Sequence, residues 1–392
     1  MVMKETQPWL KVALISRVDS HTTGLARYVY SLYNELLSAG YPVQLIPPKV
    51  PRVSEKIYNL LARRGLDART FFMNYPVRIN LDGSEICHIS SQNLATLLRV
   101  RSMPPSIVTV HDLYPLVQRM QQQKLDGIDQ WADRVAVSGL RRAREIIAIS
   151  QYTKQSVVDL LHFPSERVSV IHGAVDVNIF RPLTLPANFK AKYGLPENAS
   201  IILYVGSEDP RKNLRTLITA FSQIASQRPE AILVKAGSGH FPDEGAKLRQ
   251  RVNDLGIASR VVFLGNLPDE DLSWLYNSAD IVVMPSLFEG FGFPALEAMA
   301  CGRPVIAANA TSLPEVVGDA GVLFDPMDVD ALADAMVQLL ANPGYRYQLG
   351  ERSVVQARTF SLARQAEKTL EVYRKVMHQV KPGIEYSNEV VV

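Results

Sequence analysis

Short apolar runs alternate with segments of helical periodicity along the whole chain. The first run spans residues 12–16, and residues 26–38 follow it with apolar side chains at helical spacing and Gly40 at their end. Short apolar runs that are bounded by turn signals predict buried strands. A first series of strands is predicted at 12–16, 43–46, 85–90, 107–110, 145–150 and 168–171.

A second series of strands is predicted at 201–205, 231–236, 261–264, 281–284 and 304–308. Strands that alternate with helices form right-handed βαβ units and parallel sheets. The two series therefore predict an α/β protein with two doubly wound domains. Residues 178–186 carry two prolines and little periodicity, as a boundary does. We expect domains at 1–180 and 181–361, a last helix at 362–379 and a disordered tail at 380–392.

The segment framed by Glu289 and Glu297 carries the strongest chemical signal. It joins the predicted strand at 281–284 to a helix that Pro294 opens and Gly302 can cap. Free N–H groups and the helix dipole at such a junction attract an anion, most often a phosphate. Carboxylates accept hydrogen bonds only from donors such as hydroxyls, which sugars carry. The segment therefore predicts a site for a phosphate together with sugar hydroxyls.

Two cations follow the first strand of the second domain. After Gly206 the loop carries Arg211 and Lys212, and this pair suits a diphosphate. A solvated turn with idle charges is the alternative, but the anion expected in the same domain favours the diphosphate. The loops at Gly237 and at 262–267 are equally compatible with simple turns.

Two loops of the first domain also carry candidate residues. His111 ends the predicted strand at 107–110, and Asp112 would either orient it or cap the next helix. Gly24 precedes a helix, where its loop would approach a phosphate or sugar or form a plain turn. His88, within a predicted strand, reads as an ordinary packed histidine. Because ligands of open parallel sheets lie beyond the strand ends, two facing domains predict a site in the cleft between them.

Taken together, these residues resemble the retaining GT-B glycosyltransferases of family 4. The resemblance covers nearly the whole chain. It rests on Glu-Gly-Phe-Gly-Phe-Pro-Ala-Leu-Glu at 289–297 and the residues up to 305, and on Gly206 with Pro-Arg-Lys-Asn at 210–213. His-Gly-Ala-Val-Asp at 172–176 and Leu-Pro-Glu-Val-Val-Gly at 313–318 add to it. It implies a GT-B fold, in which two Rossmann-like domains face a deep cleft. The N-terminal domain would bind the acceptor, and the last helix would pack back onto it.

The resemblance also implies a role for each candidate residue. Lys212, with Arg211, would hold the donor diphosphate, while Glu297 accepts ribose hydroxyls and Glu289 binds hydroxyls of the transferred sugar. His111 would contact that sugar, and the loop at 262–267 would hold the base. The catalytic residues would be His111, Glu289 and Lys212, and the donor-binding residues Gly24, Gly206, Arg211, Lys212, Gly237, Leu264, Leu267, Glu289, Gly290, Phe291, Gly292, Phe293 and Glu297.

Two positions depart from the family pattern. Ser207 stands where many members carry an arginine, so Arg211 would supply the missing charge. Thr23 and Gly24 stand where many members carry paired glycines.

The implied reaction is retaining transfer of a hexose from a nucleoside diphosphate sugar. The first-domain loops resemble those of GDP-mannose users, which favours mannose, but UDP-sugars stay open. The acceptor would be a saccharide, a lipid-linked sugar or a small molecule. No Asp-x-Asp motif stands at a strand end, so we expect neither a metal nor a cofactor.

Other functions have weaker support. Gly290 to Ala295 matches the dinucleotide fingerprint of an NAD(P)-dependent oxidoreductase, but the next predicted strand runs into Asn309 and not into an acidic residue. An inactive sugar-nucleotide-binding protein conflicts with the intact Glu289, Glu297 and Lys212. A phosphorylase or epimerase of the same fold is weaker still.

Composition limits the class of protein, its partners and its location. The chain has 392 residues, of which 47% are hydrophobic and 21% charged, which indicates an ordered globular protein. A net charge of +3 gives no argument for nucleic-acid binding. Cys87 and Cys301 have no metal-ligand spacing, and with no signal peptide or membrane span in view we expect a cytoplasmic protein. The basic stretch 49–72 would contact the inner face of a membrane or, as we favour, pack on the core.

Overall fold

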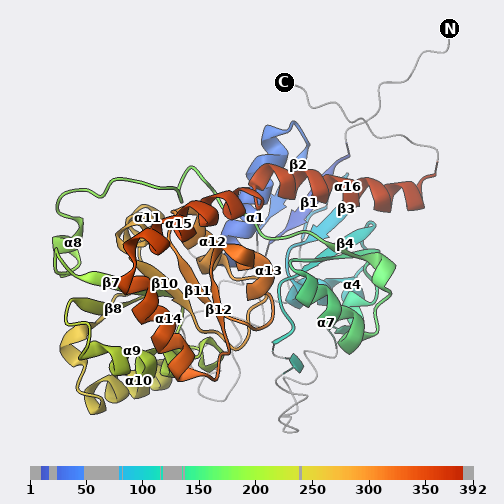
Figure 1. Cartoon of the computed structure of the whole chain (residues 1–392). Helices are drawn as coiled ribbons and strands as arrows, with labels where there is room; N and C mark the ends of the chain where they lie inside the picture. Colours follow the sequence, from blue (N-terminus) through green and yellow to red (C-terminus); the bar gives the residue numbers. More distant parts are fainter. Residues whose placement is uncertain are drawn as a thin grey trace, which may run out of the picture. The chain divides into compact units, whose positions relative to one another are not determined.

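The computed structural model describes residues 10–16, 24–47, 79–81, 83–114, 116–117, 135, 137–237 and 241–382 (Figure 1). The chain forms two compact units, Met1–His172 with Leu362–Val392, and Gly173–Ser361. The unit boundary thus lies after His172 and not after residue 180. The reason is local: Val175 N donates to Phe360 O at 3.1 Å, and Ser273 Oγ donates to Ile179 O at 2.7 Å.

The first unit contains a parallel sheet of six strands in the order β2-β1-β3-β4-β5-β6. The chain runs from β1 to one neighbour, β2, and then crosses to the other neighbour, β3, so the winding reverses beside β1. Its helices include η1 (Gln92–Thr96), α4 (Leu97–Val100) and η2 (Ser165–Arg167). The strands are β1 (Val12–Ile15), β2 (Val43–Ile46), β3 (Ile86–Ile89), β4 (Ser106–Val110), β5 (Glu145–Ala148) and β6 (Val168–Val170).

Three longer helices lie in the described part of this unit. Helix α1 (Gly24–Ser38) buries Val29, Leu32 and Leu36, as its spacing predicts. Helix α7 (Gln151–Leu161) begins where the Ser150 hydroxyl accepts a hydrogen bond from the Thr153 amide at 2.9 Å. The C-terminal helix α16 (Leu362–Val380) belongs to this unit and contacts α1.

His88 is a packed histidine, as the sequence predicts. It is fully buried, its Nδ1 lies 2.7 Å from the Tyr373 hydroxyl of α16, and its Nε2 lies 2.7 Å from Thr109 Oγ1. Burial, together with the nearby His111, lowers the pKa of His88 to about 3. The ring therefore stays neutral and ties α16 to the sheet.

The second unit repeats the architecture. Its parallel sheet has the order β12-β11-β10-β7-β8-β9, so the winding reverses between β7 and β10. The strands are β7 (Ser200–Val205), β8 (Ala231–Ala236), β9 (Val261–Phe263), β10 (Ile281–Met284), β11 (Val305–Ala308) and β12 (Val322–Phe324). The helices are α8 (Phe189–Lys192), η3 (Pro210–Lys212), α9 (Leu214–Ala225), α10 (Pro242–Asp254), η4 (Ala258–Arg260), α11 (Asp269–Ser278), α12 (Phe293–Ala300), α13 (Leu313–Val317), η5 (Gly318–Ala320), α14 (Val329–Ala341) and α15 (Pro343–Arg358).

The elements agree closely with the sequence predictions. Every predicted strand is present within two residues of its expected ends, and α16 spans Leu362–Val380 against the expected 362–379. Strand β12 was not predicted. Of its three apolar residues only Phe324 is buried, and Leu323 is exposed. The expected cleft between the domains stays a prediction.

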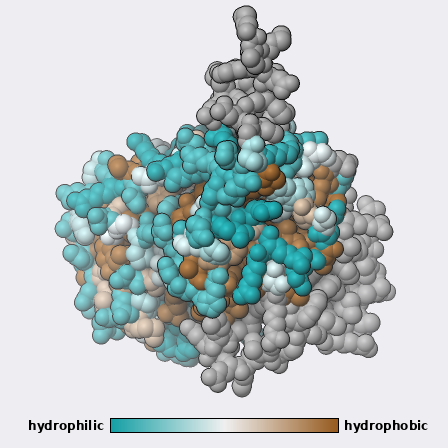
Figure 2. All heavy atoms as spheres, turned by 90° about the vertical axis from the view of Figure 1, so that its right-hand side faces the viewer, coloured by the Kyte–Doolittle hydropathy of each residue, from teal (hydrophilic) through white to brown (hydrophobic). Residues whose placement is uncertain are grey.

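Several predictions fall on residues outside the described part. These are the loop at 17–23, the basic stretch 49–72 and the tail from residue 383. Among the described residues, no helix combines the length and the apolar character that a membrane span needs. Hydrophilic residues make up much of the described surface in Figure 2, with hydrophobic ones scattered among them.

Candidate active site

The loops that follow β7 and β10 meet at the point where the winding of the second sheet reverses. The two strands are neighbours, and their connections leave in opposite directions. Ligands of open parallel sheets bind at such a point, beyond the carboxyl ends of the strands. The loop 206–213 carries the two predicted cations, and the loop 285–292 carries Glu289 and its glycines. The fold therefore brings together two signals that lie far apart in the sequence.

Hydrogen bonds join these two loops directly. The Leu287 amide donates to Arg211 O at 2.8 Å, and Arg211 Nη1 donates to Phe288 O at 3.1 Å. Asn213 Nδ2 donates to Pro285 O at 3.0 Å and to Pro326 O at 2.8 Å. These bonds hold the two loops in one fixed arrangement before any ligand binds.

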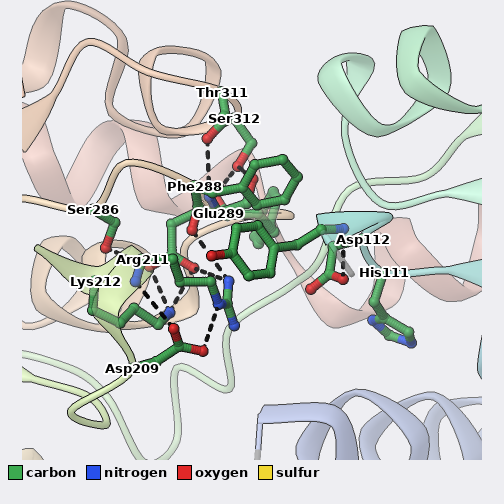
Figure 3. Close-up of polar contacts among 12 residues, drawn as sticks. His111, Asp112, Asp209, Arg211, Lys212, Ser286, Phe288, Glu289, Thr311 and Ser312 are labelled. Atoms are coloured by element: carbon green, nitrogen blue, oxygen red, sulfur yellow. Dashed lines mark hydrogen bonds and ion pairs between the residues drawn. The ribbon is translucent and has the colours of Figure 1, made fainter. Parts of the chain in front are cut away.

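Lys212 and Glu289 form an ion pair at the centre of this arrangement (Figure 3). Lys212 Nζ donates to Glu289 Oε1 at 2.7 Å and to Oε2 at 2.8 Å. Burial alone would raise the pKa of Glu289, but Lys212 and Arg211 outweigh it and lower that pKa below its ordinary value. Glu289 is therefore ionised at neutral pH. The sequence assigned the two residues to different parts of a ligand and did not reveal this pair.

The guanidinium group of Arg211 lies beside this ion pair, and some of its N–H groups donate hydrogen bonds. Its Nε donates to Asp209 Oδ2 at 3.1 Å, while its Nη1 lies 3.9 Å from Glu289 Oε2. Asp209 Oδ1 also accepts the Arg211 amide at 3.0 Å. Asp209 therefore holds the guanidinium near Glu289 and the Lys212 ammonium, which concentrates positive charge beside this carboxylate.

Three hydroxyl side chains support Glu289, and the sequence reading missed all of them. Ser286 Oγ donates to Glu289 Oε1 at 2.8 Å. The Glu289 amide donates to Thr311 Oγ1 at 3.0 Å, and Ser312 Oγ lies 3.0 Å from Glu289 O and 2.9 Å from Phe291 O. Thr311 and Ser312 directly precede the Leu-Pro-Glu-Val-Val-Gly motif, which was the available signal.

Glycine conformation shapes the turn that enters α12. Gly292 has φ +111°, and a Cβ there would lie 2.8 Å from the Leu313 side chain. Phe291 is buried, with its ring centroid 5.2 Å from that of Phe293, the first residue of α12. Gly290 precedes them in the turn. The backbone of the turn thus leads into the positive end of the α12 dipole, as a phosphate site requires.

Glu297 lies on α12 and is buried. Its Oε2 accepts a hydrogen bond from the Tyr276 hydroxyl of α11 at 2.9 Å. Tyr276 packs edge-on against Phe180, with ring centroids 5.9 Å apart. Tyr276 could not be predicted from the sequence, because nothing in its helix distinguishes it from an ordinary core tyrosine.

The other predicted donor residues of this unit also lie at strand ends. Gly206 N donates to Ala236 O at 3.0 Å, and Gly237 N donates to Gly265 O at 2.9 Å. Gly237 has φ +93°, and a Cβ there would lie 2.9 Å from Gly206 O. The predicted base-binding residues Leu264 and Leu267 follow β9, and both are half-buried. These hydrogen bonds therefore connect the carboxyl ends of β7, β8 and β9.

In the first unit, His111 follows β4. Its Nε2 lies 2.8 Å from the carbonyl oxygen of Ser90, so this nitrogen carries a hydrogen. Gln92, which the sequence reading missed, accepts the His111 amide at 3.1 Å and donates to Asp112 O at 2.9 Å. Asp112 Oδ1 accepts the Tyr114 amide at 3.4 Å, which matches the capping alternative.

Gly24 is the first residue of α1. The loop that precedes it lies outside the described residues, so its predicted contact stays a prediction. Among the residues that the structure describes, no group of three or more His, Cys, Asp or Glu side chains is arranged to hold a metal ion.

The two units and the strand-end site define a two-domain α/β protein with features suited to a sugar nucleotide. The family described as glycosyl transferases group 1 matches residues 187–354, and the family described as glycosyltransferase family 4 matches residues 22–179. The chain is 31% identical, over 296 residues, to a D-inositol 3-phosphate glycosyltransferase of Corynebacterium glutamicum, covering 72% of this chain and 69% of that protein. The chain therefore belongs to the family 4 glycosyltransferases.

Two further comparisons agree. The chain is 35% identical over 237 residues to the O-antigen chain mannosyltransferase B of Escherichia coli, covering 60% of this chain and 61% of that protein, so the match spans less than two thirds of this relative. Sucrose-phosphate synthase from Thermosynechococcus elongatus has a TM-score of 0.74 at 25% identity, covering 94% of this chain and 99% of that one. The predicted GT-B fold is thereby confirmed, and the family leaves the oxidoreductase alternative without support.

Proposed function

We propose that the protein transfers a hexose, with mannose favoured, from a nucleoside diphosphate sugar to a saccharide, lipid-linked or small-molecule acceptor, with retention of configuration and without a metal. The Lys212–Glu289 pair at the switch point of the second sheet carries this proposal. It combines a cation for the diphosphate with a carboxylate for the sugar hydroxyls.

The chemistry assigns different roles to the two members of the pair. Departure of the diphosphate leaves positive charge on the sugar ring and builds negative charge on the leaving oxygen. Lys212, Arg211 and the amino end of α12 supply fixed positive potential where that negative charge develops. Glu289 stays ionised because Lys212 and Arg211 lower its pKa, so it accepts sugar hydroxyls and favours a developing positive ring.

Glu289 acts as an orienting residue and not as a nucleophile. Lys212 donates to both of its carboxylate oxygens, and Ser286 donates to Oε1 as well. These bonds draw electron density from the carboxylate and fix its direction. The leaving phosphate then helps to deprotonate the acceptor.

Glu297 is proposed to bind the donor ribose, and His111 to contact the transferred sugar. Tyr276 donates to one oxygen of Glu297 and so fixes the plane of its carboxylate. The hydrogen bond to the Ser90 carbonyl orients the His111 ring, and the Gln92 side-chain amide accepts the His111 backbone N–H.

Mannose is favoured because a relative at 35% identity is named as a mannosyltransferase. With mannose we propose GDP as the carrier, since the first-domain loops resemble those of GDP-mannose users, and UDP-sugars are the second candidate. A cytoplasmic location with a peripheral contact at the inner membrane face belongs to the same proposal.

Calorimetry with GDP, UDP and ADP tests the donor site first. A nucleotide at a hundred times its Kd raises the stability of the folded state by about 2.7 kcal/mol, so a thermal-shift screen gives a parallel readout. No binding of any nucleotide would overturn the donor-site assignment.

Activity is tested with GDP-mannose and UDP-glucose, following release of the nucleoside diphosphate with and without acceptor oligosaccharides. Release of GDP that depends on Glu289 supports the proposed transfer. Tight nucleotide binding with no turnover on any donor or acceptor would favour the inactive sugar-nucleotide-binding protein instead.

A further inference from the structure

Thr311 has a backbone conformation that its residue type disfavours. Among the described residues, three residues other than glycine have positive φ: His162 at 50°, Asn213 at 56° and Thr311 at 53°. Histidine and asparagine are enriched in this region, whereas a β-branched residue there is a genuine outlier. Thr311 therefore carries local strain that the other two largely escape, and such outliers gather at functional sites.

The surrounding contacts explain what holds Thr311 in place. Asn309 N donates to Phe324 O at 2.7 Å, which ties the loop to β12, and Leu313 N donates to Ala310 O at 3.2 Å, which closes the turn around Thr311. Within this loop the Thr311 hydroxyl accepts the amide of Glu289 at 3.0 Å (Figure 3). Glu289 is only 5% exposed, so its amide has little access to water as an alternative partner.

The neighbouring Ser312 completes the support. Its single hydroxyl hydrogen is shared between Glu289 O at 3.0 Å and Phe291 O at 2.9 Å. Both peptide groups of Glu289 are thus held by adjacent hydroxyl residues from the loop after β11. The side chain of Glu289 is held separately, by Lys212 and Ser286.

We propose that Thr311 is a positioning residue, whose strained backbone is retained so that its hydroxyl fixes the Glu289 peptide and, with it, the carboxylate beside Lys212. This inference rests on the proposed function, in which Glu289 orients the transferred sugar. Glycine would adopt this φ without strain, but it has no hydroxyl to offer. The choice of threonine thus favours the geometry of Glu289 over local stability.

The experiment compares Thr311→Gly with Thr311→Ser and uses His162→Gly as the matched control. His162 ends α7 in the other unit with nearly the same φ. For each variant we would measure Tm, kcat and KM for the donor. Thr311→Gly relieves the strained φ but leaves the buried Glu289 amide without its acceptor, so the two effects on stability oppose each other and Tm should stay close to wild type. Because Glu289 is no longer held in position, kcat is expected to fall about tenfold. Thr311→Ser retains the hydroxyl and should keep kcat within about twofold of wild type.

His162→Gly is expected to keep or raise Tm with no change in kcat. A structural role alone would make activity follow stability, so Thr311→Gly would then keep its kcat. Wild-type kcat in Thr311→Gly would overturn the proposal, as would an equal loss in Thr311→Ser.

Amide hydrogen exchange at Glu289, measured without substrate, separates this proposal from the proposed function. Faster exchange at Glu289 in Thr311→Gly than in wild type or Thr311→Ser supports the positioning contact even if no sugar transfer is found. Unchanged exchange overturns the positioning role even if the wild-type protein transfers mannose.

Discussion

Replacing Lys212 by methionine removes the charge at the centre of the site but keeps a side chain of similar length. The ammonium donates to both Glu289 oxygens, at 2.7 and 2.8 Å. The two side chains are only 13% and 7% exposed, so water replaces the lost partner poorly. Ser286 at 2.8 Å and Arg211 at 3.9 Å still contact the carboxylate in the variant.

The expected loss of stability is large. Removing one member of a buried ion pair destabilises a protein by about 3–5 kcal/mol, because the other charge is left uncompensated. The contacts from Ser286 and Arg211 place the loss at the lower end, about 3 kcal/mol. In a domain of this size 1 kcal/mol corresponds to about 2–4 °C, so Tm of the second unit should fall by roughly 6–12 °C at pH 7.

The loss should also depend on pH. In the wild type the folded-state pKa of Glu289 is depressed, because Lys212 and Arg211 outweigh its burial. A depressed carboxyl pKa stabilises the fold above the unfolded pKa, about 4.3, and this stability disappears as the pH falls through the folded pKa. In Lys212→Met the Glu289 pKa rises, so its carboxyl protonates more readily in acid. The stability difference between wild type and variant should therefore narrow from pH 7 towards pH 4.5.

Denaturation at pH 7 and pH 4.5 measures both effects. The double variant Lys212→Met/Glu289→Gln should regain much of the stability, because no unpaired charge remains, but no transfer activity. Lys192→Met is the matched control, since Lys192 pairs with Asp271 at 2.7 Å but is 55% exposed, and its loss should be much smaller. A loss of equal size at both pH values, or a double variant no more stable than Lys212→Met, would refute this reasoning.

Three further predictions concern Glu297, Glu289 and the buried His88. Tyr276→Phe removes the hydroxyl that donates to Glu297 and should weaken GDP binding about fivefold. Calorimetry should show a smaller loss of affinity for the corresponding deoxyribonucleotide. Glu297→Ala should weaken nucleotide binding while Glu289→Ala mainly lowers turnover. Steady-state kinetics and calorimetry separate the two, and unchanged affinity and activity in Glu297→Ala would contradict its assignment. For His88, whose pKa is lowered to about 3, the unfolded chain takes up a proton below about pH 6.5 that the folded chain refuses. The free energy of unfolding of the wild type should therefore fall by up to about 1.4 kcal/mol per pH unit as the pH drops below 6.5. Urea denaturation at several pH values should show a weaker dependence of this free energy on pH in His88→Leu.

The strands were predictable because burial on both faces leaves continuous apolar runs. In β4, β8 and β10 every residue is buried, and each run could be located from the sequence. Strand β12 was missed because it is not buried on both faces: Leu323 is exposed and only Phe324 is buried. The two compact units divide eight residues before the predicted boundary, and the hydrogen bonds that tie 173–180 to the second unit leave no local pattern in the sequence.

The candidate site likewise contains residues that were predicted from the sequence and residues that were not. Lys212, Glu289 and Glu297 belong to short motifs whose residue types already indicate their chemistry. Their supports do not: Thr311 lies 22 residues from Glu289 along the chain, and Tyr276 lies 21 residues from Glu297. Threonine and tyrosine occur throughout ordinary cores and turns, so only the folded chain distinguishes those that hold a carboxylate.

Sheet order explains why these supports converge. Strands β11, β10 and β7 are consecutive in the second sheet, and all are parallel, so the loops at 309–312, 285–292 and 206–213 leave the same edge side by side. The middle loop carries Glu289, and it receives Thr311 from one neighbour and Lys212 from the other. The position of the carboxylate is thus determined by two independent loops, one of which holds its backbone and the other its side chain. Loss of either contact should shift Glu289 without unfolding the sheet, which is why the Thr311 and Lys212 variants are expected to impair activity through the same carboxylate.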